Sequence, residues 1–300
     1  MKSNKVYYNT INIIAIILAF LFLGNLVFKN KESIISVYYI NNKAGILVAG
    51  AITFCGIHIL KILRFYLILL EEKLEFKRFI RIYIKTAFIN ITLPVKIGEI
   101  FRFYCYSNET NNYKVGLLSI LLERFLDTCA LLFFMLPFEI LFRHQLSYVT
   151  LFLVIFIIIV FVIYNVFNPI YKSVNKFLIL NVESNKSLKV LEVLEKQNEW
   201  YLYTKKLIKG RFLLIFFISF LAWALEYFFV YCVAMAVEFP FSIETFNTYI
   251  NSAFIGRIDK ALGIYTVLVA IVFGITMLIV YTINLRNRRN SCARKNICGV

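Results

Sequence analysis

Three cations and three anions lie inside stretches of this sequence that are otherwise apolar: Lys61, Arg64, Glu123, Arg124, Asp127 and Glu226. A charged side chain at the centre of a bilayer costs about 2.5–3.5 kcal/mol even on lenient insertion scales. If these stretches cross a membrane, we expect the six side chains to face inward and to pair. Such pairs either lock helices together or line a path on which a charged headgroup binds, and the residues alone leave both open.

A second group of polar residues surrounds a break between two short apolar pieces, in NITLPVKIGEIFRFY (90–104). Pro94 and Gly98 interrupt the segment and free backbone groups, which hydrocarbon tolerates only beside protein or a water-filled cavity. Glu99 and Arg102 stand three residues apart and share a helix face. Broken helices often mark binding sites in membrane proteins. We therefore expect a re-entrant hairpin with a binding site, the alternative being a surface loop with a surface ion pair.

The residues just before this break predict an amphipathic helix over 76–92. Lys77, Arg78, Arg81 and Lys85 fall within an arc of about 100° on such a helix, with aromatic and aliphatic side chains mostly opposite. This pattern is typical of a helix in the membrane interface that faces anionic lipid. A helix covering the inner mouth of a bundle, with its charges solvated, fits equally well.

Composition places these residues in a membrane protein. Of 300 residues, 61% are hydrophobic and 17% are charged, mean hydropathy is +0.76, and the formal net charge is +16. Soluble domains carry roughly 25% charged residues, so an ordinary soluble enzyme is excluded. A nucleic-acid-binding domain is disfavoured because the longest stretch between apolar segments, 168–210, falls short of a domain of about 50 residues. Its LKVLEVLEKQNEWYLYTKKL run predicts a cytoplasmic amphipathic helix.

We expect an all-α polytopic membrane protein with one transmembrane domain over 1–285 and a basic tail over 286–300. Stretches of about 20 apolar residues predict about six transmembrane helices: 8–28, 44–70, 115–142, 146–167, 212–237 and 261–284. Re-entrant or interfacial segments are expected at 76–106 and at 240–260. The first apolar run is too long for a cleaved signal peptide and is expected to be retained.

The distribution of basic residues predicts the orientation. With both termini inside, cytoplasmic segments hold 24 Lys and Arg: two at the N-terminus, eight in 71–114, nine in 168–211 and five in the tail. The outer loops hold six, and three lie within spans. Because cytoplasmic loops retain positive charge, we expect a multi-pass protein of the cell membrane with cytoplasmic termini.

Four motifs resemble the lysylphosphatidylglycerol synthase transmembrane-region family, also described as flippase-like integral membrane proteins: KILRFYLILL (61–70), NITLPVKIGEIFRFY (90–104), LLSILLERFLDTCALLF (117–133) and SFLAWALEYFFVY (219–231). They are similar to the family's arginine-aromatic helix end, its P-x-x-x-G-E-x-x-R segment, its E-R-x-x-D helix and its W-x-x-E helix. The resemblance implies functional weight on ten residues: Arg64, Pro94, Gly98, Glu99, Arg102, Glu123, Arg124, Asp127, Trp223 and Glu226.

Two features depart from the family pattern. The family's second half usually has a Pro- and Gly-rich stretch ending in Glu, whereas FIGRIDKALG (254–263) contains no proline. The aminoacyl-lipid synthases of the family also append a soluble transferase domain, and none is expected here after the short basic tail. The resemblance therefore implies that the synthetic reaction is not expected.

The leading hypothesis is a flippase-like protein that translocates, or helps to translocate, an anionic or aminoacylated phospholipid or a polyprenyl-linked glycan between leaflets. Basic residues would bind the phosphate and acidic ones would balance charge when no lipid is bound: Lys96 and Arg102 at the inner face, Arg64 and Arg124 deeper, and Glu99, Glu123 and Asp127 for balance. Membrane lipids are the expected partners, and nucleic acid is not.

Two other functions remain as alternatives. One is a membrane-embedded enzyme, either an aminoacyl-lipid transferase or a polyprenyl-sugar glycosyltransferase, although the first outer loop holds only one acid, Glu32. The other is a noncatalytic scaffold for a lipid-modifying enzyme or a glycosyltransferase. No cofactor or metal is expected, because the six cysteines are scattered and no nucleotide-binding motif occurs.

Overall fold

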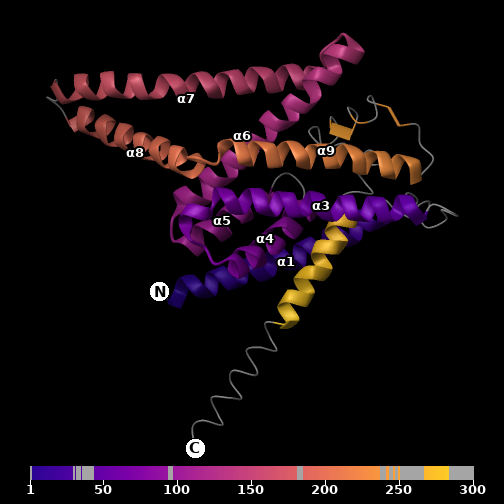
Figure 1. Ribbon diagram of the computed structural model, residues 1–300. Coiled ribbons are helices and arrows are strands. Elements are labelled where there is room, and N and C mark those ends of the chain that lie inside the picture. The colour runs from indigo at the N-terminus through magenta and orange to yellow at the C-terminus, as the bar shows by residue number, and fades with distance from the viewer. Residues whose placement is uncertain are drawn as a thin grey trace, which may run out of the picture. The chain divides into compact units, whose positions relative to one another are not determined.

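The computed structural model describes residues 2–29, 31, 35, 44–93, 97–180, 185–236, 241, 242, 246, 249, 250 and 267–283. Over these residues the chain contains helices and no strand, which confirms the predicted all-α fold. The elements follow one another as α1 (Lys2–Lys29), α3 (Ala44–Ile68), the 3-10 turn η1 (Leu70–Glu72), α4 (Phe76–Thr92), α5 (Ile97–Thr110), α6 (Tyr113–Phe138), the π-helical turn η2 (Glu139–Arg143), α7 (Tyr148–Leu180), α8 (Asn185–Ile208) and α9 (Phe212–Ala236) (Figure 1). The Val267–Ile283 helix comes last.

Four helices in the described part of the chain are long and apolar enough to cross a membrane: Thr10–Lys29, Val48–Ile68, Tyr148–Leu180 and Phe212–Ala236. They correspond to four of the six predicted spans. The predicted span 115–142 is helical as α6 and η2 but carries three charges near its middle, and the predicted span 261–284 contains the shorter Val267–Ile283 helix. The protein is therefore a multi-pass membrane protein, with four spans supported by length and composition.

The helix at the fourth predicted span, 146–167, is longer than expected. The sequence analysis ended that span at residue 167, whereas α7 continues through Pro169 to Leu180 and has 33 residues. At 1.5 Å per residue it is about 50 Å long. Most of its surface is exposed, including Phe152, Phe161 and Ile163, as expected for a helix solvated by lipid.

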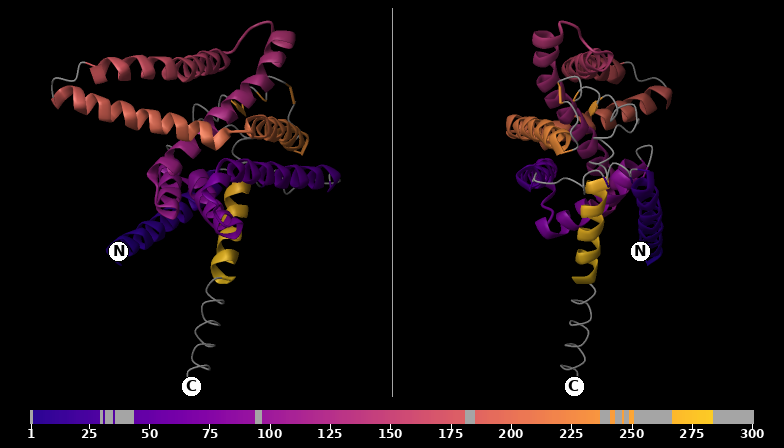
Figure 2. Two further views of the ribbon diagram at one scale, coloured as in Figure 1. Left: turned by 60° about the vertical axis from the view of Figure 1, so that its left-hand side comes forward. Right: turned by 90° about the vertical axis from the view of Figure 1, so that its right-hand side faces the viewer.

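The predicted cytoplasmic helix over residues 188–207 lies within α8. Figures 1 and 2 show α7 and α8 side by side, and they pack through aromatic rings. The ring of Tyr201 lies 5.1 Å from that of Tyr164 and 5.0 Å from that of Phe167, measured between centroids. Most of the stretch 168–210 between the predicted spans therefore belongs to a helical hairpin.

The chain forms two compact units, and the first contains α1, α4, α5 and the Val267–Ile283 helix. Its core is aromatic. Phe88 of α4 packs against Phe20 of α1, with centroids 4.9 Å apart, and Phe79 packs against Tyr106 of α5 at 6.2 Å. The amphipathic pattern of 76–92 thus buries its apolar face inside this unit, and the helix bounds of α4 match the predicted 76–92.

The second unit contains most of α3, then η1, α6, α7, α8 and most of α9. Four residues form a contact that we name the η1 clasp: Glu71, Glu72, Tyr203 and Arg211. Arg211 donates to the carbonyl of Leu67 at 3.0 Å and pairs with Glu71, while the Tyr203 hydroxyl donates to Glu72. Burial and the neighbouring carboxylates raise the pKa of Tyr203 above its usual value. The clasp therefore holds the end of α3 against α8 and the start of α9.

Candidate functional site

A buried guanidinium lies within the second unit. Arg64 on α3 is 2% exposed and contacts two carboxylates of α6. Its Nη2 lies 3.0 Å from Glu123 Oε1, and its Nη1 lies 2.5 Å from Asp127 Oδ1. Residues four apart lie on one face of a helix, so α6 presents both carboxylates together. The planar guanidinium is suited to bind two such groups at once.

Helix α9 contributes further contacts to this arrangement. Nη1 of Arg64 donates to Ser219 Oγ at 3.2 Å, and the Trp223 indole donates to the carbonyl oxygen of Asp127 at 3.2 Å. One turn before Arg64 on α3, Lys61 pairs with the buried Glu226 of α9. We name these contacts the Arg64 network, with seven members: Lys61, Arg64, Glu123, Asp127, Ser219, Trp223 and Glu226.

The network explains how charges are accommodated within a membrane unit. Each charged group costs several kcal/mol when desolvated alone, and a well-placed partner with further hydrogen bonds offsets much of that cost. Glu123, Glu226 and Arg64 are each less than 5% exposed. Three helices, α3, α6 and α9, are thus held to one another by charged contacts.

Arg124 occupies a different face of α6. The sequence analysis expected all six charges to face inward, but the Arg124 side chain is exposed, and Arg64 contacts Glu123 and Asp127. Consecutive helical residues are about 100° apart, so Arg124 cannot point where Glu123 points. Ser219 was not singled out from the sequence, although its spacing of four and seven from Trp223 and Glu226 marks the same helix face.

The first unit contains the predicted helical break. α4 ends at Thr92 and α5 begins at Ile97, so the predicted break separates two helices, which pack against each other. A Cβ atom on Gly98 would lie 2.1 Å from Asn90 Cα, far inside contact distance. Only glycine allows the two helices to approach this closely. Pro94 and Lys96 lie outside the described residues.

Arg102 is buried within this hairpin. It is 6% exposed, and its guanidinium carbon lies 5.7 Å from the ring centroid of Tyr83 on α4. Glu99 is half-buried in the first turn of α5, where a negative charge favours the helix dipole. Lys85 donates to Asn12 Oδ1 of α1 at 2.6 Å. Asn12 was not singled out from the sequence, although an amide within an apolar span is a usable signal.

Comparison of the sequence with protein-family models shows to which family the chain belongs. The model of the lysylphosphatidylglycerol synthase transmembrane region matches residues 10–246. The chain belongs to this family. No curated protein and no solved structure matches the chain significantly.

All four motifs of the lysylphosphatidylglycerol synthase transmembrane region lie inside the match. Three of them supply the Arg64 network, from α3, α6 and α9, and the fourth forms the hairpin of α4 and α5. The divergent stretch 254–263 lies beyond the match and outside the described residues. Within the described residues, no group of three His, Cys, Asp or Glu side chains is placed to hold a metal.

Proposed function

We propose that this chain translocates, or assists in translocating, a lipid with an anionic phosphate between membrane leaflets, either an aminoacylated or anionic phospholipid or a polyprenyl-linked glycan. The observation that carries the proposal is Arg64, a buried guanidinium held by two carboxylates between three helices. Membership of the transmembrane-region family is consistent with a lipid as the substrate.

The chemistry of the Arg64 network supports a phosphate substrate. Guanidinium binds carboxylates and phosphates with the same forked geometry. Glu123 and Asp127 therefore occupy positions that phosphate oxygens could take. When a phosphate binds Arg64, the released carboxylates need cations, and an aminoacylated headgroup supplies an ammonium. Lys61, three residues from Arg64, offers a second cation for the phosphate.

The hairpin keeps the role expected for it in this proposal. Lys96 and Arg102 bind the phosphate at the cytoplasmic face, while the Arg64 network binds it at membrane depth. Cytoplasmic termini follow from the excess of basic residues in the segments assigned to that side. If a cysteine introduced at Ser187 is labelled by an impermeant maleimide in intact cells, the predicted orientation is wrong.

The test is lipid transfer in proteoliposomes with headgroup-labelled lipids. Arg64→Gln should reduce transfer by at least about tenfold, because one charged hydrogen bond contributes about 1.5–3 kcal/mol. Arg64→Lys should be nearly as slow, because an ammonium lacks the fork. Lys189→Gln removes an exposed cation of α8 and should transfer at the parent rate.

Two controls make the result decisive. Each variant must elute as a single species in gel filtration, so that slow transfer is not misfolding. If folded Arg64→Gln transfers every lipid tried at the parent rate, translocation through the network is wrong. A scaffold role for α8, which exposes Leu188, Val193 and Leu202, would then be the better proposal.

A further inference from the structure

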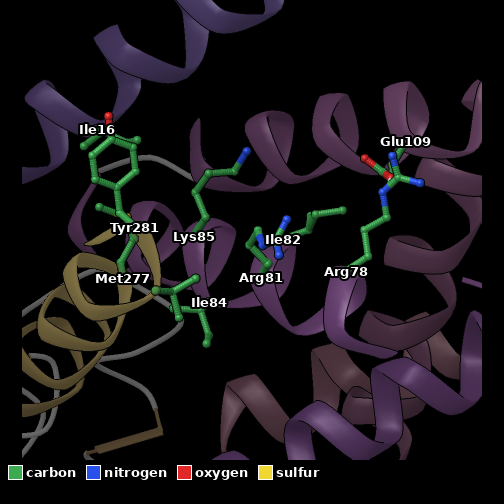
Figure 3. A pocket seen from close by; sticks show the side chains of 10 residues that line it. Ile16, Arg78, Arg81, Ile82, Ile84, Lys85, Glu109, Met277 and Tyr281 are labelled. Carbon is green, nitrogen blue, oxygen red and sulfur yellow. The ribbon is translucent and has the colours of Figure 1, made fainter. Parts of the chain in front are cut away.

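A cavity of about 380 Å³ lies within the first unit, and its lining includes no residue of the Arg64 network. Side chains from four helices line it: α1, α4, α5 and the Val267–Ile283 helix. Figure 3 shows Arg81 and Lys85 of α4 between Tyr281 and Met277 at one end and the pair of Arg78 and Glu109 at the other. The volume is that of a small-molecule site.

The charged lining is basic, and contacts hold two of its cations, Arg78 and Lys85, in place. Arg78, Arg81 and Lys85 are spaced by three and four residues and so share one face of α4. Arg78 pairs with Glu109 of α5, and the Lys85 ammonium lies between Asn12 and the ring of Phe101, 5.4 Å from its centroid. The three cations and one carboxylate give a formal charge of +2. Such a site favours a phosphate group.

The remaining lining is apolar. Ile16, Ile82 and Met277 form part of the wall, and Tyr281 presents a ring with a hydroxyl at its tip. Tyrosine with one apolar and one polar end is typical of the membrane interface. A free anion has no apolar surface to bury against this wall, whereas the glycerol and first acyl carbons of a phospholipid do.

We infer that this cavity binds the headgroup of an anionic phospholipid, with the phosphate between Arg81 and Lys85 and the glycerol against Met277 and Tyr281. This is a resident lipid site on the face of α4, and it concerns binding rather than transfer. It stands whether or not the Arg64 network moves lipid. Basic pockets between membrane helices bind anionic headgroups by the same chemistry.

The test measures binding of short-chain phosphatidylglycerol to the detergent-purified full chain by native mass spectrometry. Arg81→Gln and Lys85→Gln should each weaken binding by roughly tenfold, the effect of losing one charged hydrogen bond. Lys77→Gln is the matched control, because Lys77 is an exposed cation of the same helix outside the cavity lining. It should change binding by less than about twofold.

Two further arms separate the sources of phosphate and the two sites. Met277→Trp fills the apolar end and should weaken phosphatidylglycerol but not inorganic phosphate. Arg81→Gln should weaken phosphatidylglycerol binding by the same factor in an Arg64→Gln background as in the parent chain, which separates this site from the Arg64 network. Equal weakening by Lys77→Gln and Arg81→Gln would reduce the site to diffuse surface attraction. Inorganic phosphate or phosphatidylcholine binding as tightly as phosphatidylglycerol would overturn the headgroup assignment.

Discussion

The Arg64 network and the basic face of α4 use the same kinds of side chain under opposite conditions. Arg64 has 3% of its side chain exposed and two carboxylates in contact, whereas Arg78 has 62% exposed and pairs with Glu109. A buried charge must keep its partners, and an exposed one is solvated whether or not it has them. Burial therefore decides which charges fix the fold and which remain available to lipid.

The largest expected effect is the loss of the buried guanidinium. Arg64→Leu leaves the buried Glu123 and the partly buried Asp127 without the guanidinium, and it should lower the free energy of unfolding by about 3–5 kcal/mol. Combining it with Glu123→Gln and Asp127→Asn should recover most of the stability without recovering lipid transfer. Denaturation in detergent measures the stability of the single and triple variants, and the proteoliposome assay measures their lipid transfer.

Arg78→Leu is the exposed counterpart to this change. It should cost less than about 1 kcal/mol, as surface ion pairs do. Equal losses from Arg64→Leu and Arg78→Leu would break the distinction between the two regions. A triple variant with parent transfer would instead reduce the network to packing.

A smaller effect is expected for single ion pairs compared by double-mutant cycles. Lys61→Met and Glu226→Gln should show a coupling energy of about 1–3 kcal/mol, because Glu226 is buried. The pair of Lys196 and Glu192 on α8 has side chains 63% and 69% exposed and should show about 0.3–0.5 kcal/mol. Indistinguishable coupling energies would show that burial does not set their strength.

The smallest effect concerns the η1 clasp, whose exposure lies between these extremes. The pKa of Tyr203 is raised in the folded chain, so the protonated hydroxyl stabilises the folded state. This contribution is fully present below the unfolded pKa of about 10 and decreases as the pH rises above it. Thermal stability should thus fall less between pH of about 8 and about 11 in Tyr203→Phe than in the parent chain. Tyr171→Phe, on α7, serves as control, and an unchanged pH dependence in Tyr203→Phe would contradict the assignment.

Local patterns predicted the elements better than their contacts. The amphipathic period placed α4 at its observed bounds, and the Pro94 and Gly98 interruption placed the break between α4 and α5. Both depend on residues near in sequence. The predicted end at residue 167 was wrong for the helix, because Pro169 was placed outside the span whereas α7 continues through it to Leu180.

Contacts between helices required information that one sequence does not carry. The charges of 44–70, 115–142 and 212–237 were expected to face inward, but the choice of Arg64 over Arg124 depends on how far α3 and α6 are rotated and how deep each lies. The cavity beside Arg81 was not predicted either. Its wall comes from Met277 and Tyr281, almost 200 residues away in the chain.

The length of α7 sets a condition on the bilayer itself. A helix of about 50 Å tilted by 40°, the upper end of the observed range, still spans about 38 Å along the membrane normal, against about 30 Å of hydrocarbon. At that tilt each residue advances about 1.15 Å along the normal, so roughly seven residues must leave the hydrocarbon at one end or the other. Lys172 and Lys176 near the C-terminal end can reach the headgroups from there. Membrane thickness is thus coupled to the position of the hairpin that α7 forms with α8, since a thicker bilayer admits more of α7 and draws α8 toward its surface.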